Sequence, residues 1–131
     1  MEETMSDLKF YFCKHCGKIV FLLKDSGVPT VCCGDEMQEL KAGVTDAAME
    51  KHVPAVKIEA NKVSVTVGSV EHPMEEKHYI EWILLETNQG IYQKRLAPGK
   101  APKADFLLLD GEKAKAVYEY CNLHKLWKAD V

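Results

Sequence analysis

The clearest pattern in the chain is an alternation of apolar and polar residues in its C-terminal two-thirds. Residues 62–67 read Lys-Val-Ser-Val-Thr-Val, which places three valines on one face of an extended strand. Residues 78–84 alternate in part, and the period predicts one face shared by His78, Ile80, Trp82 and Leu84. We therefore expect two half-buried strands in this region.

Glycine and proline divide the remaining apolar segments into further short strands. Turn signals at residues 88–90 and 97–102 separate an apolar segment at 91–96 from another at 106–109. Residues 112–120 begin with Lys and Ala, which favour a helix, and continue with Val and Tyr, which favour a strand. The regular spacing of the neighbouring strands favours a strand here too. This arrangement predicts a mainly β fold with an antiparallel β-sandwich.

The first forty residues follow another pattern, in which short apolar runs are interrupted by cysteine pairs. Cys13 and Cys16 are followed by a glycine, and so are the adjacent Cys32 and Cys33. Two such pairs joined by a hairpin are typical of two loops that bind one metal ion. We therefore predict an N-terminal metal domain at residues 1–40 and a β-sandwich domain at residues 41–131. Between them, residues 45–51 are expected to form a helical turn capped by Thr45.

Composition narrows the functional classes. A hydrophobic fraction of 47% is sufficient for a core, and a net charge of -3 without a basic stripe argues against a nucleic-acid partner. The sequence contains no apolar run of transmembrane length and no signal peptide, so we expect no membrane partner and a cytoplasmic location.

The cysteines are better explained as ligands than as disulfides. Thiols stay reduced in a chain without export signals. The adjacent pair gives its sulfurs a different bite from a Cys-x-x-Cys pair, so we expect a distorted tetrahedron. Spacing alone favours structural zinc, and iron in the same cage would add a one-electron redox couple. His15 is expected to be a solvent-facing loop residue.

A second group of metal-type ligands lies in the C-terminal domain. Its members are His52, His72, His78, Cys121 and His124. Taken singly, each has a structural explanation, because a lone His is usually a hydrogen-bonded rim residue and a lone Cys is usually core. As a set they predict a mixed His/Cys site, and their chemistry leaves zinc, iron and copper open.

Longer motifs resemble a known family. Besides the cysteine pairs, they are Glu50-Lys51-His52-Val53-Pro54, the segment from Gly68 to Trp82 that contains His72 and His78, and Glu119-Tyr120-Cys121-Asn122-Leu123-His124. Over nearly the whole chain from about residue 9 to 128, these motifs resemble desulfoferrodoxin, the two-iron form of superoxide reductase.

The resemblance implies two iron sites on two folds. The first iron would be bound by Cys13, Cys16, Cys32 and Cys33 on a desulforedoxin-like domain. The second would be held on an immunoglobulin-like β-sandwich by the four imidazoles of His52, His72, His78 and His124, with Cys121 as the axial thiolate. The family also implies a homodimer and a rubredoxin-like electron donor, and it leaves a calcium ion undecided.

The expected reaction is the one-electron reduction of superoxide to hydrogen peroxide without oxygen release. By resemblance, Glu50 and Lys51 lie beside the open position of the second iron, where the lysine charge would attract superoxide. Without the resemblance, these two residues would be read as an ordinary exposed charge pair. Two alternatives remain open: a non-catalytic two-iron electron carrier, and a β-sandwich protein that is stabilised by zinc and acts as a binding module.

Overall fold

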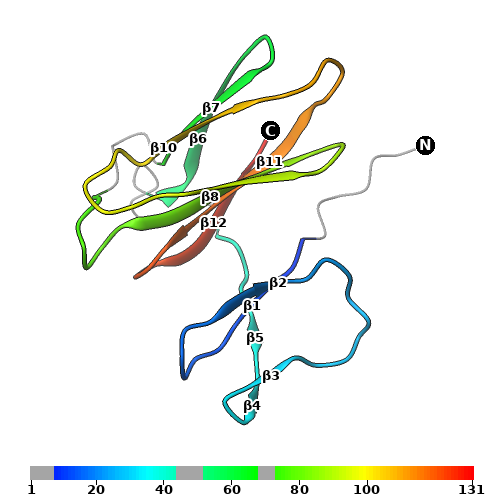
Figure 1. Ribbon diagram of the computed structural model, residues 1–131, viewed down its shortest axis with the longest axis vertical. Coiled ribbons are helices and arrows are strands. Elements are labelled where there is room, and N and C mark those ends of the chain that lie inside the picture. Colours follow the sequence, from blue (N-terminus) through cyan, green and yellow to red (C-terminus); the bar gives the residue numbers. More distant parts are fainter. Residues whose placement is uncertain (1–7, 44–51, 68–72) are drawn as a thin grey trace. The chain divides into compact units, whose positions relative to one another are not determined.

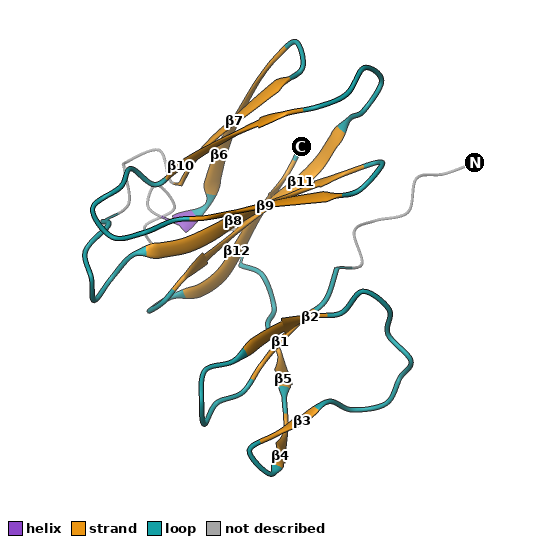
Figure 2. Cartoon of the chain, viewed as in Figure 1, coloured by secondary structure: helices purple, strands orange, loops and turns teal. Residues whose placement is uncertain are grey.

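The computed structural model describes residues 8–43, 52–67 and 73–131, and the chain divides into two compact units, Met1–Lys41 and Ala42–Val131. Antiparallel sheets account for most of the regular structure in both units (Figure 1, Figure 2). The prediction of a mainly β chain is therefore confirmed. The helical turn expected at residues 45–51 lies outside the described residues. Within the described part of the chain, no helix has the length and apolar character needed to cross a membrane.

The N-terminal unit consists of two small sheets. One has the strand order β2-β1-β5, and the other is the hairpin of β3 and β4. The strands are β1 (Phe10–Phe12), β2 (Ile19–Phe21), β3 (Val31–Cys32), β4 (Asp35–Glu36) and β5 (Gln38–Glu39). Phe10 is 3% exposed and packs on Phe21, with 5.3 Å between the ring centroids. A core this small makes a bound metal a natural source of stability.

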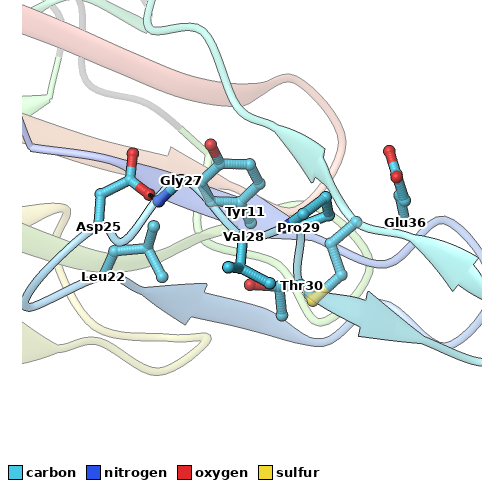
Figure 3. A pocket seen from close by; sticks show the side chains of 9 residues that line it. Tyr11, Leu22, Asp25, Gly27, Val28, Pro29, Thr30 and Glu36 are labelled. Atoms are coloured by element: carbon cyan, nitrogen blue, oxygen red, sulfur yellow. Dashed lines mark hydrogen bonds between the residues drawn. The ribbon is translucent and has the colours of Figure 1, made fainter.

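A loop between β2 and β3 encloses a pocket on this unit (Figure 3). The cavity has a volume of about 230 Å³, and Tyr11, Leu22 and Pro29 contribute to its lining. Asp25 organises the loop, because its Oδ1 accepts the backbone N–H of Gly27 at 2.8 Å and its Oδ2 accepts from Lys9 Nζ at 3.0 Å. These two contacts, the backbone donor first, lower the pKa of Asp25.

The C-terminal unit is a sandwich of two antiparallel sheets. The first sheet has the order β10-β7-β6 and the second the order β12-β11-β8-β9. Their strands are β6 (Pro54–Glu59), β7 (Lys62–Val67), β8 (Ile80–Thr87), β9 (Ile91–Arg95), β10 (Lys103–Leu107), β11 (Ala114–Cys121) and β12 (Lys125–Asp130). This strand order is that of an immunoglobulin-like sandwich, as predicted. The strand chosen for residues 112–120 is confirmed from Ala114 onward, because β11 begins there and residues 112–113 belong to the preceding loop.

The core lies between the two sheets. Val63, Val65 and Val67 are at most 1% exposed, which confirms the predicted apolar face. The predicted face of β8 is wrong beyond Ile80, because a β-bulge shifts the alternation: Cys121 pairs with Ile80 while Tyr120 pairs with Trp82. As a result, the core takes Ile80, Ile83 and Leu85, whereas Trp82 stacks on Tyr120 with 5.8 Å between centroids.

The buried carboxylate of Glu112 connects β8 and β9 with the loop that precedes β11. Glu112 Oε2 accepts a hydrogen bond from the Thr87 hydroxyl at 2.6 Å, and Oε1 accepts from Tyr92 Oη at 2.8 Å and from the Leu109 backbone N–H at 3.1 Å. These donors, that of Thr87 first, lower the pKa of Glu112 below its ordinary value of 4.5. The charged form is therefore the one that the fold stabilises.

We predict that Glu112→Gln lowers the thermal unfolding midpoint by several degrees at neutral pH. The lowered pKa of Glu112 means that its contribution is present above pH 4.5 and is lost as pH falls through the folded-state pKa. The difference from wild type should therefore shrink in acid. Circular dichroism melts across this pH range would test it, with Glu59→Gln as a control because Glu59 is exposed and its carboxylate pairs with Lys57 Nζ at 2.9 Å on the surface. A difference independent of pH would contradict the prediction.

Candidate metal centres

The first cysteine pair lies on a tight loop that follows β1. The Cys13 backbone N–H donates to Lys18 O at 2.9 Å, and the Gly17 N–H donates to Cys13 O at 2.8 Å. Gly17 has a φ of 81°, in the left-handed region that glycine adopts without strain. The loop thus turns both sulfurs, Cys13 and Cys16, toward one point.

The second pair lies at the tip of the β3–β4 hairpin. Cys32 is the last residue of β3 and pairs with Asp35, so that Cys33 and Gly34 form the two-residue turn. Their φ values are 54° and 80°, and a turn with two positive φ values is the type I′ turn that suits a right-handed hairpin twist. This turn explains how two adjacent cysteines can both serve one ion.

The four sulfurs form a group that fits a metal ion. Their ligand atoms all lie within 4.8 Å of one another. The Sγ atom of Cys32 is 3.6 Å from that of Cys16 and 3.9 Å from that of Cys33. Two thiolates about 2.3 Å from a tetrahedral ion would be about 3.8 Å apart, so the spacing suits a metal and is far too long for a disulfide.

The thiols also respond to one another electrostatically. The backbone N–H of Cys16 is the main cause that lowers the pKa of Cys13, to about 6. Hydrogen bonding to Cys13 is the main cause that raises the pKa of Cys32, to about 12. One thiolate therefore forms readily, whereas a further thiolate needs a cation to replace its proton.

His15 does not join this ligand group. Its Nε2 lies 2.6 Å from Asp35 Oδ2, and both side chains are substantially exposed. The contact links the first loop to the β3–β4 hairpin, and it lowers the pKa of Asp35. His15 is thus a solvent-facing residue that also bridges the two loops.

A second ligand group lies in the C-terminal unit. It comprises His52, His78, Cys121 and His124, whose ligand atoms lie within 4.8 Å of one another. His52 Nε2 is 3.0 Å from His124 Nδ1, and that nitrogen is 3.7 Å from Cys121 Sγ. Nitrogens about 2.1 Å from one ion and at right angles to each other would be about 3.0 Å apart. The donors therefore suit a metal of the borderline or transition class.

Cys121 and His124 are held by the hairpin between β11 and β12. Cys121 is fully buried and pairs with Lys125, whose φ of 72° closes the turn. Burial raises the pKa of Cys121, while the backbone N–H groups of Leu123 and His124 lower it. His124 itself is exposed, so the group has a dry thiol on one side and solvent on the other.

His78 is held by another tight turn. The Glu75 N–H donates to His78 O at 2.9 Å, and the His78 N–H donates to Glu75 O at 3.0 Å. This reciprocal pair closes a two-residue turn immediately before β8.

Asn122 joins these two turns. Its Oδ1 accepts from the Tyr79 N–H at 3.0 Å, its Nδ2 donates to Lys77 O at 3.0 Å, and its backbone N–H donates to Tyr79 O at 3.2 Å. One side chain, next to Cys121, thus holds the backbone on both sides of His78.

The structure brings together eight of the nine predicted metal ligands, in two separate groups of four. The other predicted site residues, Glu50, Lys51 and His72, lie outside the described residues. Sequence reasoning missed two residues that support the second group: Asn122, whose hydrogen bonds hold the backbone on both sides of His78, and Trp127, whose indole stacks on His52. Their position beside Cys121 and His124 in sequence was the available signal.

Comparisons with known proteins cover both units. A family model described as Desulfoferrodoxin matches residues 44–130. A desulfoferrodoxin of Nitratidesulfovibrio vulgaris is 52% identical over 124 residues, which cover 93% of this chain and 95% of the relative. The crystal structure of the superoxide reductase from Treponema pallidum aligns with a TM-score of 0.82 at 33% identity, covering 95% of this chain and 98% of that one. A one-iron superoxide reductase from Giardia intestinalis aligns at 39% identity with a TM-score of 0.53, and covers 63% of this chain and 97% of its own. The resemblance seen in the motifs is confirmed.

We predict that Asn122→Ala weakens metal binding at the second group by about 10- to 100-fold, because outer-shell contacts orient metal ligands. Chelator competition on the full chain would measure the affinity. Asn88→Ala is the matched control, because Asn88 Oδ1 accepts from the Lys113 N–H at 3.0 Å at the other end of the β8–β11 pair. Equal affinities in the two variants would contradict a positioning role for Asn122.

Proposed function

The chain belongs to the desulfoferrodoxin family, and we propose that it is a superoxide reductase. The reaction is the addition of one electron and two protons to superoxide, which forms hydrogen peroxide without oxygen release. The observation that carries this proposal is the second ligand group, in which three imidazoles and a buried cysteine sulfur converge within 4.8 Å. Similarity to the solved superoxide reductase from Treponema pallidum over 95% of this chain supports it.

We propose two iron ions as cofactors. Cys13, Cys16, Cys32 and Cys33 would hold the first, and His52, His72, His78, Cys121 and His124 the second. Ferrous iron at the second site would supply the electron. The donor chemistry fits, since imidazole and thiolate are ligands that iron accepts.

Cys121 has the clearest task among the described residues. Its burial raises its pKa, so in the absence of a cation the thiol keeps its proton at neutral pH. A bound cation replaces that proton, and the backbone N–H groups of Leu123 and His124 favour the resulting thiolate. The fold therefore provides a water-excluded negative charge that favours the oxidised, more positive state of a metal.

Lys51 and Glu50 are proposed to serve the substrate. Lys51 directly precedes the ligand His52 in sequence, and Glu50 lies two residues before it. A lysine charge next to the site would raise the local concentration of the superoxide anion, an effect that salt screens. Glu50 would place a carboxylate at the open position when the iron is oxidised.

Further proposals concern the setting of the reaction. We propose that residues 1–40 form the four-cysteine iron domain and residues 41–131 the catalytic domain, in a cytoplasmic homodimer that receives electrons from a rubredoxin-like donor. The alternative function is a two-iron electron carrier without catalysis.

The function is tested with the purified iron-loaded protein and a superoxide flux. We expect superoxide consumption with hydrogen peroxide as product, no oxygen release, and oxidation of one ferrous centre for each superoxide consumed.

Cys121→Ser should lose the thiolate-to-iron charge-transfer band of the oxidised protein, because the ligand atom is replaced. Oxygen release would indicate dismutation instead, and an iron centre that leaves superoxide unconsumed would favour the electron carrier.

We predict that Lys51→Ala slows the second-order reaction with superoxide by about 10-fold and leaves the iron content intact, because it removes an attracting charge. Pulse radiolysis at low and high salt would measure the rate. Lys77→Ala is the matched control, because it makes the same change in net charge in the exposed turn before His78. Equal rates in the two variants would exclude a specific role for Lys51.

A further inference from the structure

Trp127 contacts two members of the second ligand group. Its indole stacks on the His52 imidazole, with 5.0 Å between centroids and 20° between planes. Its Nε1–H donates to the backbone O of His124 at 2.9 Å. One side chain from β12 therefore restrains a ligand ring and the backbone of another ligand.

Gly43 lies against the same indole. Its N–H donates to Leu126 O at 2.9 Å, and its O accepts from the Lys128 N–H at 2.8 Å, so its backbone is held on both sides of Trp127. A Cβ atom at position 43 would lie 2.6 Å from Cε3 and from Cζ3 of Trp127. Space, and not a left-handed φ, is what requires glycine here.

We propose that Gly43 and Trp127 are positioning residues of the second metal site, which orient His52 and His124 through a stack of backbone, indole and imidazole. The backbone at Gly43 supports the indole, and the indole in turn supports the ring of His52. His52 and Trp127 are 75 residues apart in sequence, so no local preference aligns them.

The physical reason lies in the freedom of a histidine side chain. An imidazole that rotates about its side-chain bonds presents its nitrogen in several directions, and ordering it upon metal binding costs conformational entropy. A ring already restrained by stacking loses less of that freedom. Outer-shell contacts of this kind commonly change metal affinity by about 10- to 100-fold.

This inference rests on the proposed use of the second site to bind iron, and it is independent of the reaction. It therefore concerns metal affinity and the spectrum of the bound metal. A wild-type protein that binds iron at this site but leaves superoxide unconsumed would overturn the proposed function and leave the inference standing.

The test compares Gly43→Ala with Gly90→Ala in the full chain. Gly90 is the matched control, because an added Cβ there meets nothing within 4 Å and its φ is not in the left-handed region. Affinity for Fe²⁺ is measured by chelator competition, and the thiolate-to-iron band of the oxidised protein is recorded. We expect Gly43→Ala to lose about 10- to 100-fold in affinity at the second site and to shift the band, with the four-cysteine site unchanged. Wild-type affinity and band in Gly43→Ala would overturn the proposal.

A second pair of variants removes dependence on the folding of Gly43→Ala. Trp127→Phe keeps an aromatic ring but loses the Nε1–H donor. It also removes the six-membered-ring carbons of the indole with which an added Cβ at position 43 would clash. We expect this variant to bind Fe²⁺ more weakly and with a shifted band, and we expect the double variant Gly43→Ala/Trp127→Phe to lose less than the sum of the two single losses. An unchanged affinity and band in Trp127→Phe, or strictly additive losses, would overturn the proposal.

Discussion

The antiparallel pairing of β8 with β11 is the constraint on which the second ligand group depends. It sets Cys121 opposite Ile80, two residues after His78, and so brings together donors that are more than forty residues apart in sequence. The bulge opposite Tyr120 and Cys121 keeps Cys121 in the dry core while the alternation of β8 changes. Loss of this register would separate the thiol of Cys121 from the imidazole of His78, even with both local turns intact.

Around that strand pair, short-range contacts refine the geometry. A reciprocal pair of backbone hydrogen bonds fixes the turn before His78, Asn122 ties this turn to the Cys121–His124 hairpin, and Trp127 restrains two imidazole-bearing residues. Each contact is individually modest, on the order of 1 kcal/mol for a hydrogen bond. Together they replace side-chain freedom with a preorganised set of donors, which is the condition for tight metal binding.

The N-terminal unit follows a different principle. It buries few apolar side chains, among them Phe10, Met37 and Leu40, and its cysteines lie on two tight turns that need positive φ values. Four sulfurs gathered within 4.8 Å would be mutually repulsive as thiolates without a cation. A metal ion at this point would therefore supply stability that the small core lacks, whereas in the C-terminal unit a complete sandwich core supports the site.

The sequence by itself determined the ligand types, the pairing of the cysteines, most of the strands and the family, because ligand chemistry and two-residue periodicity are local properties of the chain. It assigned the site roles of Glu50 and Lys51 by resemblance, and that of His72 also from its place among the other metal-type ligands; all three stay predictions. Only the tertiary structure decided which residues of β8 face the core, how Cys33 turns, and why Gly43, Asn122 and Trp127 matter. Those features depend on strand register and on contacts between distant segments, which no local pattern records.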